Sequence, residues 1–129
     1  MQNKFLGTGQ PGFHPIRKIR VGLRGTWYAI RFDFAVAYKL ALSIPLLVVC
    51  FAFQQWLDFG VILVATGMML VAEMFNTTIE ALCDYLVDEH DEKIGIIKDI
   101  AAAAAGVSIF VWTAVIVTES IRVWGLLQN

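Results

Sequence analysis

Charged residues are scarce in this chain of 129 residues. They make up 16% of it, below the roughly 25% of soluble domains, whereas hydrophobic residues make up 58%. The mean hydropathy is +0.67. This composition excludes an ordinary soluble domain and indicates an integral membrane protein.

Several other features are missing. The two cysteines, Cys50 and Cys83, lack the spacing of metal ligands and support neither a zinc site nor a disulfide, so both are expected to be small apolar fillers. No apolar stretch typical of a signal peptide lies within the first 30 residues. The chain also lacks the GxxxxGK[ST] phosphate-binding loop, which excludes a P-loop site.

What the chain does have is long uncharged segments. Segments 40–57 and 100–118 are each long enough to cross about 30 Å of hydrocarbon as a helix. The apolar stretch 59–72 reaches that length only if its helix continues to about residue 87; the alternative is an interfacial or re-entrant segment. We predict transmembrane helices at about 36–56, 59–87 and 99–124, with Asp58-Phe59-Gly60 as the tight connection between the first two.

The N-terminal region differs from the rest. Residues 1–13, rich in Gly, Asn and Gln, are expected to be a flexible lead to a single membrane domain over residues 14–129. From about residue 14 to 34, apolar residues recur at helical spacing while arginines line another face, which predicts an amphipathic surface helix. The arginine face either meets anionic head groups or is simply solvated.

Basic residues also indicate the orientation. Seven of the ten Lys and Arg residues precede Leu40, which predicts a cytoplasmic N-terminus and, after three spans, a C-terminus outside. Lys39, at the start of the first span, is predicted to be able to snorkel to the cytoplasmic interface.

The acidic residues concentrate in one segment. Residues 73–99 carry eight of the eleven Asp and Glu residues and separate two apolar runs. At 100° per residue, five polar side chains fall within an arc of about 100° on one helix face, called the polar stripe below: Glu73, Asn76, Thr77, Glu80 and Asp84. Carboxylates at membrane depth are costly unless they face a polar interior, so they are functional candidates.

These side chains suit two kinds of chemistry. Mg²⁺ typically takes one or two protein carboxylates, which Glu80 and Asp33 can supply, and the remaining positions suit phosphate oxygens. Phosphoryl transfer to a hydroxyl needs a base and a cation, for which Glu73 and Lys98 are candidates. A small transporter with an intramembrane proton or cation relay accounts for the same spacing equally well.

One family shares this pattern. The motif Glu73-x-x-Asn76-x-x-x-Glu80-x-x-x-Asp84, followed by Glu89 and by Gly95-x-x-Lys98-Asp99 ahead of an alanine-rich span, resembles the signature of the prokaryotic diacylglycerol kinase family, which includes undecaprenol kinases. The resemblance runs from about residue 14 to 124 and is ungapped over 73–99. The chain departs from the pattern at Asp33, where the family usually has Glu, and at residues 89–91, where the family usually has Glu-Tyr-His and this chain has Glu-His-Asp. A basic residue common in the family near the start of the surface helix is His14 here.

The resemblance implies a homotrimeric all-α membrane protein with a surface helix, three transmembrane helices and sites shared between subunits. It implies an ATP-dependent kinase in the bacterial inner membrane that phosphorylates diacylglycerol or, alternatively, undecaprenol, and that binds no nucleic acid. Glu73 would be the catalytic base beside Asn76, and Asp33 and Glu80 would bind Mg²⁺. The implied ATP ligands are Asp33, Glu80, Glu89, His90, Asp91, Lys98 and Asp99, and the implied lipid contacts are Arg24, Glu73 and Lys98.

Overall fold

The computed structural model describes residues 14–87 and 91–128, and these residues form helices and no strand. The helices are α1 (Pro15–Phe32), α2 (Phe34–Ala52), α3 (Trp56–Leu86) and α4 (Glu92–Leu127). The chain divides into one compact unit that ends at Phe34 and a second that begins at Ala35. The predicted flexible lead, and Glu89 and His90 of the predicted ATP site, lie outside the described residues.

The helix predicted from about residue 14 to 34 is present as α1. Pro15 occupies one of its first two positions, where the missing N–H costs no hydrogen bond. The helix ends at Phe32, two residues earlier than predicted, because Asp33 adopts an extended backbone and its N–H closes the last turn on the carbonyl of Ala29. Its apolar side chains, including Ile16 and Leu23, are exposed, as expected for a helix that lies on a membrane.

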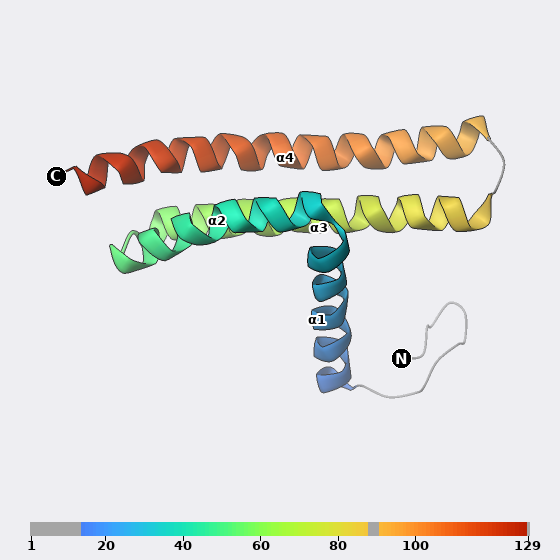
Figure 1. Ribbon diagram of the computed structural model, residues 1–129, viewed down its shortest axis with the longest axis horizontal. Helices are drawn as coiled ribbons and strands as arrows, with labels where there is room; N and C mark the ends of the chain where they lie inside the picture. The colour runs from blue at the N-terminus through green and yellow to red at the C-terminus, as the bar shows by residue number, and fades with distance from the viewer. Residues whose placement is uncertain (1–13, 88–90, 129) are drawn as a thin grey trace. The chain divides into compact units, whose positions relative to one another are not determined.

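The second unit contains three helices that are long and apolar enough to cross a membrane. Figure 1 shows α3 and α4 running side by side in opposite directions from the connection that joins them. The 31 residues of α3 and the 36 of α4 correspond to about 46 and 54 Å at 1.5 Å per residue, beyond the roughly 30 Å of hydrocarbon. The two helices therefore extend past the apolar layer as a helical hairpin.

Buried side chains, both small and large, hold α3 and α4 together. Ala65 and Met69 of α3 pack against Trp112 of α4 in one buried cluster. Ala101 and Ala105 are buried while the alanines between them are exposed, so one edge of the alanine run forms the contact.

Hydrogen bonds attach α2 to the other two helices. The hydroxyl of Ser43 accepts bonds from the Thr66 hydroxyl of α3 and from the Trp112 indole N–H of α4, both 3.0 Å long. It also lies 3.0 Å from the backbone carbonyl of Lys39, one turn earlier, to which it donates. Because all of these groups are buried, the hydrogen bonds at Ser43 fix the position of α2 along the bundle.

A second polar cluster lies near the end at which α2 and α3 are joined. Arg122 of α4 contacts the buried Asp58 of α3 at 3.1 Å and lies 3.7 Å from the buried Glu119, one turn earlier on its own helix. Asp58 Oδ2 and Glu119 Oε2 are buried and have no hydrogen-bond partner among the described residues. A half-exposed guanidinium thus neutralises part of the charge that two buried carboxylates bring into an apolar region.

The positions of both connections differ from the prediction. The chain turns between α2 and α3 at Phe53–Gln55, and Gln54 takes a left-handed backbone with φ 56°. Asp58-Phe59-Gly60, predicted as the turn, lies inside the first turns of α3, where an acidic residue suits the positive end of the helix dipole. The prediction was wrong because it placed the turn at the glycine, whereas Gln54 provides the left-handed residue.

The segment between α3 and α4 is also shorter than predicted. The third transmembrane helix was expected from about residue 99, but α4 begins at Glu92. Asp91 caps it: its Oδ1 accepts hydrogen bonds from the backbone N–H groups of Lys93 and Ile94 at 2.8 and 3.2 Å. Lys98 therefore lies in the second turn of the helix rather than at its start.

Candidate active site

The polar stripe runs along α3 from a buried end to an exposed end. Glu73 is buried, Asn76 and Glu80 are half-buried, and Asp84 is exposed. Apolar side chains on the opposite face, including Phe75, Leu82 and Leu86, are exposed.

The length of the helix gives the depth of the stripe. About 20 helical residues span the hydrocarbon layer, so a helix that enters at Trp56 leaves it near Asn76. Glu73 then lies just inside the boundary, and Glu80 and Asp84 lie beyond it. The stripe therefore connects the apolar layer with the aqueous side, where a lipid hydroxyl and a water-soluble donor can both arrive.

Glu73 forms an ion pair with Lys39 of α2. Both residues are buried, with 6% of Glu73 and 2% of Lys39 exposed. Lys39 does not snorkel to the interface, contrary to the prediction, because it lies on the face of α2 that packs into the bundle and Glu73 provides a partner there.

Asn76 and Glu80 form the next level of the stripe. The Asn76 amide donates to Glu80 Oε1 at 2.8 Å, and this bond orients the carboxylate. Asn76 Oδ1 is buried and has no hydrogen-bond partner among the described residues. An amide oxygen beside a carboxylate is a donor set that suits Mg²⁺, so these residues fit the metal that the family resemblance implies.

Magnesium ligation by Asp33 and Glu80 together stays a prediction. Asp33 follows the last residue of α1 and belongs to the first unit, whereas Glu80 belongs to the second. Over residues 14–87 and 91–128, no three His, Cys, Asp or Glu side chains are grouped closely enough to hold a metal ion.

Asp84 and Lys98 join α3 and α4 at the exposed end of the stripe. Lys98 Nζ lies 2.8 Å from Asp84 Oδ1. Together with Asp91 and Asp99 they line a pocket of about 320 Å³ next to the connection between the helices. This volume is at the low end of small-molecule sites, which are roughly 300–1,000 Å³. The pocket brings together the three predicted ATP ligands Asp91, Lys98 and Asp99, and Asp91 also caps α4.

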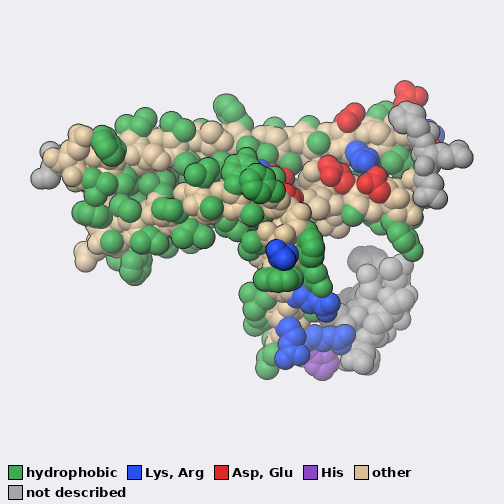
Figure 2. Space-filling view, viewed as in Figure 1, with side chains coloured by type: hydrophobic (Ala, Val, Ile, Leu, Met, Phe, Trp, Pro, Cys, Tyr) green, Lys and Arg blue, Asp and Glu red, His purple; other side chains and the backbone are tan. Residues whose placement is uncertain are grey.

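The distribution of charge supports a site at this end of the bundle. Figure 2 shows Asp and Glu side chains gathered on the part of the α3 and α4 pair nearest their connection, with basic atoms among them. The opposite part is covered mainly by hydrophobic side chains. By the rise of the helix, Glu73 and Asp84 are about 16 Å apart, so Glu73 and Lys98 lie at opposite ends of the stripe.

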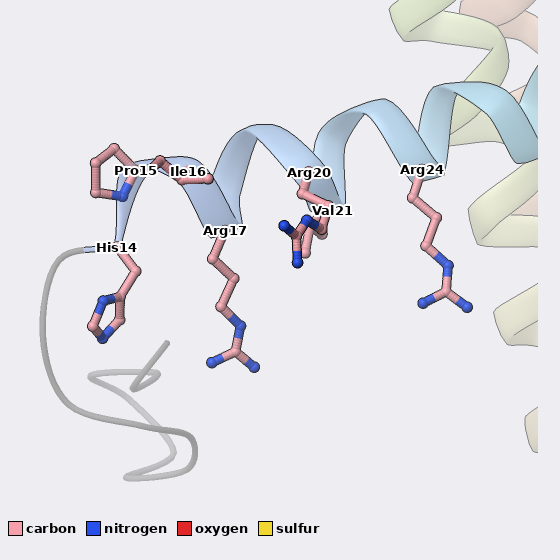
Figure 3. A pocket seen from close by; sticks show the side chains of 7 residues that line it. All are labelled: His14, Pro15, Ile16, Arg17, Arg20, Val21 and Arg24. Atoms are coloured by element: carbon pink, nitrogen blue, oxygen red, sulfur yellow. The ribbon is translucent and has the colours of Figure 1, made fainter.

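The basic face of α1 carries the predicted lipid contact Arg24. Figure 3 shows Arg24 projecting to the same side of the helix as His14 and Arg17, and these residues line one pocket with Arg20. Arg24 donates a hydrogen bond to the Tyr28 hydroxyl at 3.3 Å and lies over its ring. This hydrogen bond raises the pKa of Arg24 above its ordinary value.

The comparison with known families identifies the chain. The family described as prokaryotic diacylglycerol kinase matches residues 20–119, which include the polar stripe and Lys98. The chain belongs to the prokaryotic diacylglycerol kinase family. Neither a curated protein nor a solved structure gives a significant match. Membership of a lipid kinase family favours phosphoryl transfer over the proton or cation relay as the role of the stripe.

Sequence reasoning missed the contribution of α2 to the site. Lys39 was taken for an interfacial anchor, yet it lies at helical spacing with Val36 and Ser43, and all three are buried. The polar Ser43, one turn after Lys39 in an otherwise apolar span, was the available sign that this face is internal.

Proposed function

We propose that this protein transfers the γ-phosphoryl group of ATP to the hydroxyl of diacylglycerol at the cytoplasmic face of the bacterial inner membrane. The observation that carries the proposal is the polar stripe, which begins with a buried carboxylate at the edge of the apolar layer and ends at a charged pocket. Undecaprenol is the alternative acceptor, because its hydroxyl would also reach the edge of the apolar layer where Glu73 lies.

Glu73, Asn76 and Lys98 have roles that suit their positions along the site. Glu73, the deepest carboxylate, accepts the proton of the lipid hydroxyl as the oxygen attacks phosphorus. Asn76 orients Glu80 through their 2.8 Å hydrogen bond. Lys98, at the aqueous end, offsets the negative charge of the ATP phosphates, with Asp91 and Asp99 beside it in the pocket.

Magnesium is the expected cofactor. Glu80, Asp33 and the carbonyl oxygen of Asn76 would hold it, and when bound it neutralises charge on the phosphate oxygens of ATP. Arg24 would contact the lipid head group from α1, where the helix lies along the surface.

Assembly as a homotrimer with shared sites is part of the proposal. One copy offers a pocket of only about 320 Å³ at its charged end. Large apolar side chains remain exposed on each transmembrane helix, such as Leu42, Phe75 and Phe110, and they provide surface for contact with other copies as well as with lipid. A nucleotide, a metal ion and a lipid are more fully enclosed between copies than on one.

A direct assay tests the function. Detergent-solubilised protein is incubated with γ-labelled ATP and Mg²⁺, with either diacylglycerol or undecaprenol as the acceptor. We expect labelled phosphatidic acid to form faster than labelled undecaprenyl phosphate. The reverse order would select the alternative acceptor, and no transfer to either lipid by folded protein would contradict the proposal.

Mixing inactive subunits tests the shared site. Subunits with Glu73→Gln and subunits with Lys98→Met are each expected to be inactive, and co-refolding them should restore part of the activity if the two residues serve one site from different chains. Crosslinking must first show the oligomer, and each variant refolded alone is the control. Crosslinked mixed oligomers without recovered activity would place both residues in the same chain, and an active monomer would exclude shared sites.

A further inference from the structure

Lys39 is a buried cation to which the mechanism above gives no role. It lies in the second turn of α2, 2% exposed, and its ammonium contacts the carboxylate of Glu73 on α3. The pair therefore joins two transmembrane helices at the level where the stripe enters the apolar layer.

A lone carboxylate at this depth would be a poor base. A charged group in an apolar environment is strongly disfavoured, and an isolated buried carboxylate takes up a proton instead of remaining ionised. A protonated carboxyl group cannot accept the proton of a hydroxyl. Lys39 supplies the opposite charge that stabilises the ionised form of Glu73, and the two charges together are neutral.

The surrounding contacts hold Lys39 in place. Ser43, one turn further along α2, bonds to the backbone carbonyl of Lys39 and accepts hydrogen bonds from Thr66 and Trp112. These bonds fix α2 against both α3 and α4 one helical turn away from the ion pair. The ammonium is also 5.2 Å from the centre of the Tyr38 ring, a favourable contact for a cation.

We propose that Lys39 is a positioning residue of the kinase reaction: it keeps Glu73 ionised and holds its carboxylate at the edge of the apolar layer. The inference rests on the proposed function of Glu73 as the base. It adds that catalysis depends on a cation supplied by α2, a helix from which the sequence predicted no part of the site.

The first test measures the ion pair without reference to activity. Thermal unfolding midpoints are determined in detergent micelles for the wild type, Lys39→Met, Glu73→Gln and the double variant. Each single variant leaves one polar or charged group buried without its ionic partner, and we expect it to lower the midpoint by roughly 10 °C or more. The double variant should lose clearly less than the sum of the two. Additive losses would overturn the pairing.

The second test separates positioning from folding. In the lipid kinase assay, Lys39→Met should lower kcat by roughly tenfold or more and leave the KM for ATP within about twofold. Lys39→Arg, which keeps the charge, should recover a substantial part of kcat. Lys93→Met, which removes an exposed lysine of α4, is the matched control and should leave kcat unchanged. A folded Lys39→Met variant with wild-type kcat would overturn the role of Lys39.

A charge exchange covers the case in which Lys39→Met does not fold. Lys39→Glu combined with Glu73→Lys keeps an ion pair between α2 and α3, so its unfolding midpoint should be higher than that of either single reversal. It should be inactive, because position 73 then carries no carboxylate. An exchange no more stable than the single reversals would argue against the pair. A wild type without lipid kinase activity would instead overturn the proposed function, and the unfolding measurements would still judge the pair.

Discussion

Glu73→Gln should lower turnover at least about 10²-fold, the usual loss when a general base is removed. Glutamine keeps the size of the side chain and can accept a hydrogen bond from Lys39, but it cannot take up the hydroxyl proton. ATP binding should be largely kept, because Glu73 lies at the end of the stripe away from the charged pocket. Initial rates with γ-labelled ATP and a lipid acceptor, and nucleotide binding measured separately, give the two quantities.

A loss of activity in Glu73→Gln must be distinguished from a loss of folding stability. Breaking one side of a buried ion pair costs about 3–5 kcal/mol of stability, so the unfolding midpoint of Glu73→Gln has to be measured beside its activity. Glu119→Gln is the matched control. Glu119 is also 6% exposed, but it lies near the end of α4 that is away from the charged pocket. More than about a third of wild-type turnover in Glu73→Gln would remove Glu73 from the role of the base, because loss of a base costs far more.

Glu80→Gln and Asp33→Asn should each raise the Mg²⁺ concentration needed for half-maximal activity by roughly tenfold or more, because Mg²⁺ is held by only one or two protein carboxylates. Asp33→Glu, which introduces the residue usual in the family, should be tolerated. Titration of activity with Mg²⁺ at saturating ATP measures the effect.

Further variants test the metal-binding roles of Glu80 and Asp33 separately. Glu80 is oriented by Asn76, so Asn76→Ala should also raise the Mg²⁺ concentration needed for half-maximal activity, as Glu80→Gln does. Glu92→Gln removes an exposed carboxylate from the first turn of α4 and should leave the titration curve unchanged. Wild-type titration curves for both Glu80→Gln and Asp33→Asn would show that the metal is held elsewhere.

The polar stripe was predictable because it depends on one helix. Five polar positions at helical spacing share a face whatever surrounds them. On α3, Glu73 is buried, Asn76 and Glu80 are half-buried, and Thr77 and Asp84 are exposed. The bond between Asn76 and Glu80 follows from the same spacing, since residues four apart on a helix are neighbours.

The connections were predicted less well, because their residues give weaker signals. Gln54 adopts a positive φ although it is neither glycine nor asparagine, so its residue type does not predict the left-handed conformation. The start of α4 was foreseeable from Asp91, a good capping residue, but the run of charges around it was interpreted as a solvated loop.

The sequence by itself determined the all-helical class of the protein, its three long apolar helices, its N-terminal amphipathic helix and its family, because composition and helical periodicity are properties of each segment alone. Only the tertiary structure decided which side chains from different helices meet. It paired Lys39 with Glu73 and Asp84 with Lys98, and it joined Ser43 to Thr66 and Trp112. These contacts depend on the rotation and the offset of one helix against another. The packing of all three helices sets this rotation and this offset. Neither quantity can be predicted from the hydrophobic period of a single helix.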